Sequence, residues 1–210
     1  MSPERLVALL LGVLAFPMAI PTARKLLGHD AGFLRDLGFL SGPPGTLLAW
    51  GLALVVAAAY IGFAVGNVPP VARTWRQMRW LKLLALAAAI AAATVEEALF
   101  RRTVMDAVMQ RGGGVGLQVL LSAVTFGLAH ALFGLIKRNV GAAVRASVIT
   151  GLLGGALGVV YAVGGRSLAP CIASHFLITL ALEPGLLLAA VTGEWRRAAV
   201  HEGVEARAPA

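Results

Sequence analysis

Long apolar segments follow one another along the chain, and they limit what it can fold into. A helix needs roughly 20 mostly apolar residues to cross the ~30 Å hydrocarbon core of a bilayer. Six segments meet or approach this length: Leu6 to Ala23, Thr46 to Val65, Trp80 to Gln110, Gly112 to Ile136, Ala146 to Gly165 and Ser167 to Leu182. The sequence therefore predicts an all-α fold, a polytopic transmembrane helical bundle of about six spans.

The composition supports a membrane protein. Of the 210 residues, 59% are hydrophobic and 13% are charged, and the mean hydropathy is +0.83. Soluble domains are about 45–50% apolar and about 25% charged. These values exclude a disordered chain and an ordinary water-soluble enzyme. Cys171 is the single cysteine, so the chain is not a disulfide scaffold either.

The net charge of +8 does not indicate nucleic-acid binding, because Lys and Arg lie between the apolar segments rather than along one face. Basic residues at helix ends suit anionic lipid head groups, which we expect as partners. In a six-span topology, more of these residues fall on the side of the two termini, which favours termini in the cytoplasm. The Ala-, Gly- and Arg-rich composition favours a bacterial plasma membrane. The sequence does not indicate an oligomeric state.

Three regions follow from the order of the segments. Residues 1–79 hold the N-terminal spans and loops, residues 80–192 hold a helical core, and residues 193–210 form a solvated C-terminal tail. We expect the second span to break at Asn67-Val-Pro-Pro. We expect Glu183-Pro184 to interrupt the last span, with a short apolar tail after it.

Few ionisable residues lie within the apolar segments, and each costs at least a few kcal/mol in hydrocarbon. The candidates for a functional site are Glu96, Glu97, Arg101, His130 and His175. Glu97 and Arg101 are four residues apart and share one helix face. Glu96 is rotated from Glu97 by about 100° and faces other neighbours. His175 shares a face with Thr179.

This set of residues permits two kinds of hydrolytic chemistry. A carboxylate and an imidazole that converge on one water form a general base, and a second imidazole with a neighbouring hydroxyl can stabilise an oxyanion. One carboxylate and two histidines could instead hold zinc. The alternative without function is a structural ion pair with hydrogen-bonded core histidines. The coincidence of these residues on three helices favours a functional site.

Two motifs resemble those of a family of intramembrane proteases. Residues 96–101 read Glu-Glu-Ala-Leu-Phe-Arg and match Glu-Glu-x-x-x-Arg, and residues 126–130 read Phe-Gly-Leu-Ala-His and match Phe-x-x-x-His. His175 stands where a third motif begins. From Trp80 to Leu188 the chain resembles the CPBP family (CAAX protease and bacteriocin-processing, also called Abi). The first two spans carry no matching motif.

The resemblance implies an endopeptidase similar to the type II CAAX prenyl endopeptidases, which remove the last three residues of prenylated proteins. It implies that Glu96 and His130 activate a water, that His175 contributes to an oxyanion hole, and that Glu97 and Arg101 position the base. The substrate would be a membrane-embedded or lipidated peptide or protein. The family has been described both as metalloproteases and as glutamate-dependent proteases, so zinc stays an alternative and no metal is assigned.

The third motif departs from the family pattern at Thr179, where Asn or Asp is usual. A threonine hydroxyl can donate to an oxyanion, but it can also bond the carbonyl four residues back in its own helix. Loss of one oxyanion donor typically lowers a rate by ~10²–10³. This departure supports a second hypothesis, a catalytically weak or inactive protein of the same fold that acts as an immunity or chaperone-like partner. A transporter is disfavoured, because the chain has no two-fold repeat and few spans.

Overall fold

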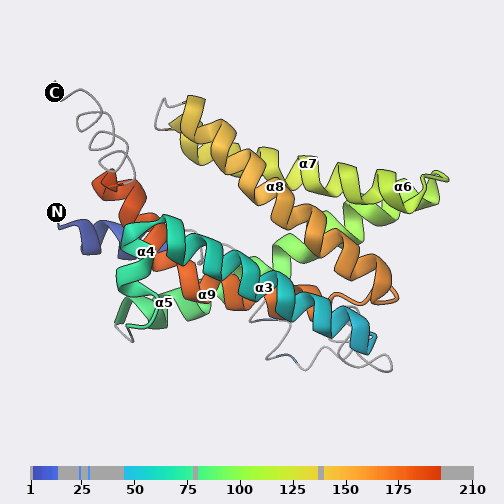
Figure 1. The fold of residues 1–210 in the computed structure, drawn as a ribbon, viewed down its shortest axis with the longest axis horizontal. Helices are drawn as coiled ribbons and strands as arrows, with labels where there is room; N and C mark the ends of the chain where they lie inside the picture. The colour runs from blue at the N-terminus through green and yellow to red at the C-terminus, as the bar shows by residue number, and fades with distance from the viewer. Residues whose placement is uncertain are drawn as a thin grey trace, which may run out of the picture. The chain divides into compact units, whose positions relative to one another are not determined.

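Helices make up the regular structure of the chain. The computed structural model describes residues 2–13, 24, 28, 45–77, 80–136 and 140–194, and only the backbone of residues 132–136. The described residues contain no strand, so the predicted all-α class is confirmed. The helices are α3 (Leu47–Asn67), α4 (Pro69–Thr74), α5 (Trp80–Glu97), the π-helix η1 (Ala98–Met105), α6 (Asp106–Gln110), α7 (Val115–Ile136), α8 (Val140–Val163) and α9 (Ala169–Thr192) (Figure 1).

Among the described residues, four helical stretches are long and apolar enough to cross a membrane: α3, the continuous stretch Trp80–Gln110, α8 and α9. α7 adds an apolar helix whose side chains are described over Val115–Ala131. The first predicted span is described only at its beginning, where residues 3–13 are helical, and the rest of it lies outside the described residues. The helices agree with a bundle of about six spans.

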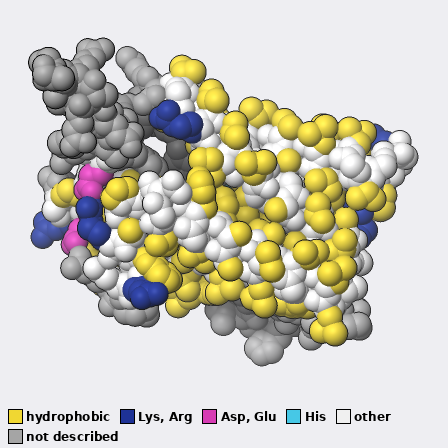
Figure 2. Space-filling model, in the orientation of Figure 1, with side chains coloured by type: hydrophobic (Ala, Val, Ile, Leu, Met, Phe, Trp, Pro, Cys, Tyr) yellow, Lys and Arg dark blue, Asp and Glu magenta, His cyan; other side chains and the backbone are white. Residues whose placement is uncertain are grey.

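Apolar side chains cover exposed faces as well as buried ones. Val144, Val148 and Leu152 follow each other at four-residue spacing on α8, and Leu152 is 71% exposed. Figure 2 shows hydrophobic side chains spread over the visible surface. Lipid tails are as apolar as these side chains, so contact with lipid carries no free-energy cost, whereas exposure of such stripes to water is unfavourable. The chain is therefore an integral membrane protein.

The chain divides into two compact units. We call residues 1–21, 58–92 and 176–210 the terminal unit, because it contains both chain ends. We call residues 22–57 and 93–175 the motif unit, because it contains the first two motifs and His175. α3, α5 and α9 each continue from one unit into the other.

In the motif unit, α7 and α8 lie side by side and approach closely, because glycines meet at their contact (Figure 1). A Cβ atom added to Gly127 would lie 2.4 Å from the Ser147 carbonyl oxygen, which is closer than a side chain allows, and 3.1 Å from the Cα of Gly151. A Cβ atom on Gly154 would lie 3.0 Å from the Cβ of Phe126. The absence of these side chains places the α8 backbone directly beside Phe126.

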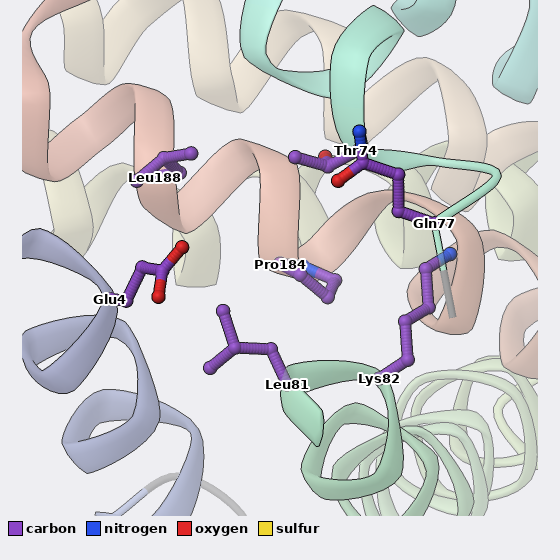
Figure 3. Close-up of a pocket in the computed structure, with 7 residues that line it drawn as sticks. All are labelled: Glu4, Thr74, Gln77, Leu81, Lys82, Pro184 and Leu188. Atoms are coloured by element: carbon purple, nitrogen blue, oxygen red, sulfur yellow. The ribbon is translucent and has the colours of Figure 1, made fainter. Parts of the chain in front are cut away.

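The terminal unit has an apolar core that joins the N-terminal helix, α5 and α9. Its buried members are Val7, Leu11, Leu81, Ala85, Ala88 and Leu187. A cavity of about 30 Å³ lies in the same unit, lined by Glu4, Thr74, Gln77, Leu81, Lys82, Pro184 and Leu188 (Figure 3). None of the predicted site residues lines this cavity.

The predicted interruption of the last span is wrong. α9 does not stop at Glu183-Pro184 but continues to Thr192 with Pro184 inside it. Pro184 has no N–H to offer the carbonyl of Leu180. The Lys82 ammonium fills this gap, since Nζ lies 3.1 Å from the Leu180 oxygen, 3.2 Å from the Ala181 oxygen and 2.7 Å from the Trp75 oxygen.

Two other boundaries can be compared with the structure. The break at Asn67-Val-Pro-Pro is confirmed, because α3 ends at Asn67 and α4 begins at Pro69. The fifth predicted span was placed at Ala146 to Gly165, but α8 begins earlier, at Val140, and ends at Val163. The early start brings Arg145 into the helix, a residue that sequence reasoning assigned to the preceding loop.

Candidate active site

The motif unit brings together five of the six predicted site residues. Glu96 and Glu97 end α5, Arg101 lies in η1, His130 lies on α7 and His175 on α9. Segments far apart in the sequence therefore contribute to one group of side chains. Its members range from buried Glu97 to Glu96 and His130, which remain about a quarter exposed.

The helix that carries the first motif widens directly after the two glutamates. α5 ends at Glu97, and η1 is a π-helix in which the Thr103 hydroxyl donates to the Ala98 carbonyl, five residues earlier, at 3.3 Å. π-helical turns are rare and frequently occur at functional sites. The sequence predicted a helix here but not its wider turn, because the spacing of apolar residues does not distinguish the two helix types over one or two turns.

Glu97 is fully buried and holds a partner on each carboxylate oxygen. Oε1 lies 2.7 Å from Nδ1 of His175, and Oε2 lies 2.9 Å from Nε of Arg101. The second contact is an ion pair whose angle departs from that of a linear hydrogen bond. Because both oxygens are engaged, Glu97 is suited to orient its neighbours rather than to accept a proton.

Phe126 supports the charged residues from α7. The Arg101 guanidinium lies over its ring, 4.9 Å from the centroid, and the His175 ring meets it edge-on at 5.8 Å. The ring of His130 is 4.6 Å away. Arg101 is itself fully buried, and its Nη2 donates to the Gly154 carbonyl at 3.2 Å. The phenylalanine of the second motif is thus in contact with three of the predicted site residues.

The hydrogen bonds determine which nitrogen of each histidine carries the hydrogen. Nδ1 of His130 lies 2.9 Å from the Phe126 carbonyl, and a carbonyl only accepts, so this nitrogen carries the hydrogen. Nδ1 of His175 likewise donates to the Glu97 carboxylate. In a neutral imidazole the opposite nitrogen, Nε2, then bears a lone pair. Nε2 is therefore the acceptor atom of each neutral ring.

Glu96 faces both of these nitrogens. Its Oε2 lies 4.0 Å from Nε2 of His130 and 3.9 Å from Nε2 of His175. The same oxygen is buried and has no hydrogen-bond partner among the described residues. Separations near 4 Å are too long for direct hydrogen bonds and are typical of groups that share a bridging water. An unpartnered buried oxygen calls for such a partner.

The described residues do not fit a zinc site in this arrangement. Zinc bonds of about 2.0–2.2 Å in tetrahedral geometry place ligand atoms about 3.4 Å apart, whereas Glu96 Oε2 is 3.9–4.0 Å from the two imidazole nitrogens. Among the described residues, no group of three or more His, Cys, Asp or Glu side chains is arranged to hold a metal ion.

Thr179 is not among these contacts. It lies in the terminal unit, one turn beyond His175 on α9. Two other side chains of α9 could act as nucleophiles, Cys171 and Ser174, but both are buried. The Cys171 thiol also donates to the Leu157 carbonyl at 3.4 Å. The nucleophile suggested by this geometry is therefore a water held by Glu96.

Sequence reasoning missed Gly154, which accepts the Arg101 hydrogen bond and leaves room for the Phe126 ring. The many glycines of the fifth apolar segment indicated close helix packing, but they did not indicate which glycine the arginine meets. That choice depends on the relative rotation of η1, α7 and α8, which the sequence pattern does not contain.

Comparison with known proteins adds one finding. Residues 78–181 match a family model described as Type II CAAX prenyl endopeptidase Rce1-like. The matched segment contains the first two motifs, His175 and Thr179. No curated protein and no solved structure matches the chain.

Proposed function

Over residues 78–181 the chain belongs to the Rce1-like family of type II CAAX prenyl endopeptidases, and we propose that it is an intramembrane endopeptidase in which Glu96 and His130 activate the attacking water. One observation carries the proposal. Glu96 Oε2 is buried without a hydrogen bond among the described residues, and it faces the Nε2 atoms of His130 and His175 at 4.0 and 3.9 Å.

The proposed reaction is a direct hydrolysis. As the water oxygen attacks the carbonyl carbon of the scissile peptide bond, one of its protons passes to the Glu96 carboxylate, and His130 Nε2 holds the water by accepting its other hydrogen. The carbonyl oxygen becomes an oxyanion. The proton on Glu96 then passes to the leaving nitrogen as the C–N bond breaks, which yields an amine and a carboxylic acid. No bond forms between protein and substrate.

His175 has a different role in this proposal, because its Nδ1 is already engaged with Glu97. Its Nε2 carries a hydrogen only when the ring is doubly protonated, and in that form it can donate to the oxyanion. In this proposal His175 acts in its doubly protonated form, beside the carboxylates of Glu96 and Glu97. Glu97 and Arg101 act as positioning residues, because their contacts fix the His175 ring.

The substrate that we propose is a membrane-embedded or lipidated peptide or protein. Support comes from the family description and from the apolar helices that carry the site residues. Cytoplasmic termini, a bacterial plasma membrane and anionic lipids as partners are supported by the distribution of Lys and Arg and by the composition.

The test compares peptide termini in membranes from cells that express the wild type, Glu96→Ala or His130→Ala at matched levels. Glu194→Ala is the control, because it removes a carboxylate outside the site. Mass spectrometry should find new N- and C-termini with the wild type and the control, and a loss of at least ~10²-fold in both site variants. Undiminished cleavage by Glu96→Ala would refute the proposal. Loss of cleavage with a chelator, restored by zinc, would show that a metal takes part.

The second candidate is a weak or inactive protein of the same fold that acts as an immunity or chaperone-like partner. The residue that supports it is Thr179, which replaces the usual Asn or Asp of the family pattern. Under this hypothesis the cellular phenotype survives Glu96→Gln and depends instead on loop or helix-surface residues.

Thr179→Asn separates a weak site from an inactive one. If the shorter threonine limits oxyanion binding, the asparagine should raise the cleavage rate, by up to ~10²–10³ for a fully restored donor. Cleavage of a peptide that spans the site found above measures the change. A lower rate would contradict an oxyanion role for residue 179.

A further inference from the structure

A second polar cluster lies in the motif unit, around Arg166 in the loop between α8 and α9. The Arg166 Nε donates to Asp106 Oδ1 at 2.9 Å, its Nη2 contacts the same oxygen, and its Nη1 donates to Gln118 Oε1 at 3.0 Å. Tyr161 donates its hydroxyl to Asp106 at 3.2 Å and lies beneath the guanidinium, 5.0 Å from ring centroid to Cζ. These four residues, which we call the Arg166 cluster, connect α6, α7, α8 and the loop before α9.

The backbone at Arg166 indicates that its side chain is needed. Arg166 has φ of 64°, in the left-handed region, directly after Gly165 with φ of 65°. A residue with a Cβ atom pays a conformational penalty there, whereas glycine does not. The loop uses glycine at both preceding positions, Gly164 and Gly165. The strain at Arg166 is therefore maintained by the contacts of its guanidinium.

The Arg166 cluster joins the same two chain segments as the Glu97–His175 contact. Asp106 follows Glu97 along the continuous helical stretch Trp80–Gln110, and Arg166 precedes His175 by the same interval in the sequence. A single contact between two segments leaves them free to rotate about it. Two contacts, one at each end, define how they lie against each other.

We propose that the Arg166 cluster positions the active site by docking the loop before α9 onto Asp106 and Gln118, which sets where His175 meets Glu97 and Glu96. The expected effect on cleavage rests on the proposed function, whereas the expected effect on the position of His175 does not. Arginine suits the task because its planar fork reaches Asp106, Gln118 and the Tyr161 ring at once, which lysine cannot do. A displacement of about 1 Å at a catalytic group can cost ~10² in rate.

The decisive variant is Arg166→Gly, which keeps the left-handed backbone accessible and removes only the side-chain contacts. The matched control is Arg111→Ala, because Arg111 is an exposed arginine of the same unit whose Nη1 donates to the Ala107 carbonyl of its own helix. Asp106→Asn serves if the glycine variant does not fold, since it keeps the size of the side chain and removes its charge.

The first readout needs no substrate. In protein labelled with ¹⁵N-histidine, the His175 resonances are assigned by their loss in His175→Gln. Arg166→Gly and Asp106→Asn should shift or broaden the His175 Nδ1 signal, which reports the bond to Glu97, while Arg111→Ala leaves it unchanged. An unchanged His175 signal in both cluster variants would overturn the inference.

The second readout is kinetic and uses a peptide that spans the cleavage site identified in membranes. We expect kcat to fall by about 10- to 100-fold in Arg166→Gly with little change in KM, and Arg166→Lys to recover only part of the loss. Wild-type kcat in folded Arg166→Gly would overturn the positioning role. If no wild-type cleavage is found, the proposed function fails, and the histidine signals still decide whether the cluster positions His175.

Discussion

The two units of the protein both bury charge, but they satisfy it in different ways. In the motif unit, Glu97 and Arg101 are fully buried and are partnered mainly by other ionisable side chains. In the terminal unit, Lys82 is 7% exposed, and its three ammonium hydrogens have three backbone carbonyls as acceptors.

The two units differ in how many buried polar atoms are left without a hydrogen-bond partner. Around Glu97, four polar atoms lack a hydrogen bond among the described residues. Oε2 of Glu97 and Nε of Arg101 form an ion pair with each other, and Nη1 of Arg101 and Oε2 of Glu96 remain. The Lys82 ammonium has no donor to spare, because each of its three hydrogens has a carbonyl acceptor. One of these carbonyls, that of Leu180, would otherwise bond the N–H that Pro184 lacks. Unsatisfied capacity beside a buried ion pair can bind water or substrate, whereas a saturated charge stabilises a helix. Burial alone therefore does not mark a functional charge.

The largest effect is expected from Arg101→Ala. The substitution leaves Glu97 buried without its counter-ion, and breaking a buried pair in this way typically costs about 3–5 kcal/mol. We expect that loss in the free energy of unfolding, measured by detergent denaturation, together with loss of cleavage. Arg111→Ala provides the baseline for an exposed arginine. A change in stability no greater than that baseline would contradict the pairing.

A smaller effect is expected from Lys82→Met, which leaves buried carbonyls of α9 without a donor. We expect it to lower the free energy of unfolding by about 1–3 kcal/mol. Cleavage per folded molecule should remain at the wild-type level. In a Pro184→Ala background the cost should shrink, because the alanine N–H can bond the Leu180 carbonyl. A double-mutant cycle on the free energy of unfolding measures this coupling. Strict additivity would show that Lys82 does not compensate for Pro184.

The smallest effect is expected at the exposed pair of Arg73 and Glu194, in which the arginine side chain is 58% exposed. Arg73→Ala should cost at most about 1 kcal/mol, since water and salt screen such pairs. The difference from the wild type should diminish in ~1 M salt, where the Debye length is about 3 Å. A loss as large as that of Lys82→Met would show that exposure does not rank these charges.

Sequence patterns predicted the features that depend on nearby residues. The break after Asn67 follows from two adjacent prolines, and the Glu97–Arg101 pair follows from helical spacing. The continuation of α9 past Pro184 was not predictable in this way, because its compensating donor, Lys82, is distant in the sequence.

In the candidate site, too, some features were predictable from the sequence and others depend on contacts between distant residues. Its residues were found from their rarity in apolar sequence and from the family resemblance, and the structure places five of them together. The nitrogen that carries the hydrogen in each histidine depends on hydrogen bonds, one of which joins His175 to a residue of another helix. The pattern of residue types contains no information about such bonds, and it likewise gave no sign of the Arg166 cluster.

The π-helix η1 has a consequence for the spacing between Glu97 and Asp106. A π-helical turn contains one residue more than an α-helical turn, so it offsets the angular phase of everything that follows it. If the same residues formed an ordinary α-helix, Asp106 would be turned by about 100° relative to Glu97. The extra residue thus allows one helix to direct Glu97 at His175 and Asp106 at Arg166. The length of this segment, and not only its composition, is part of what defines the site.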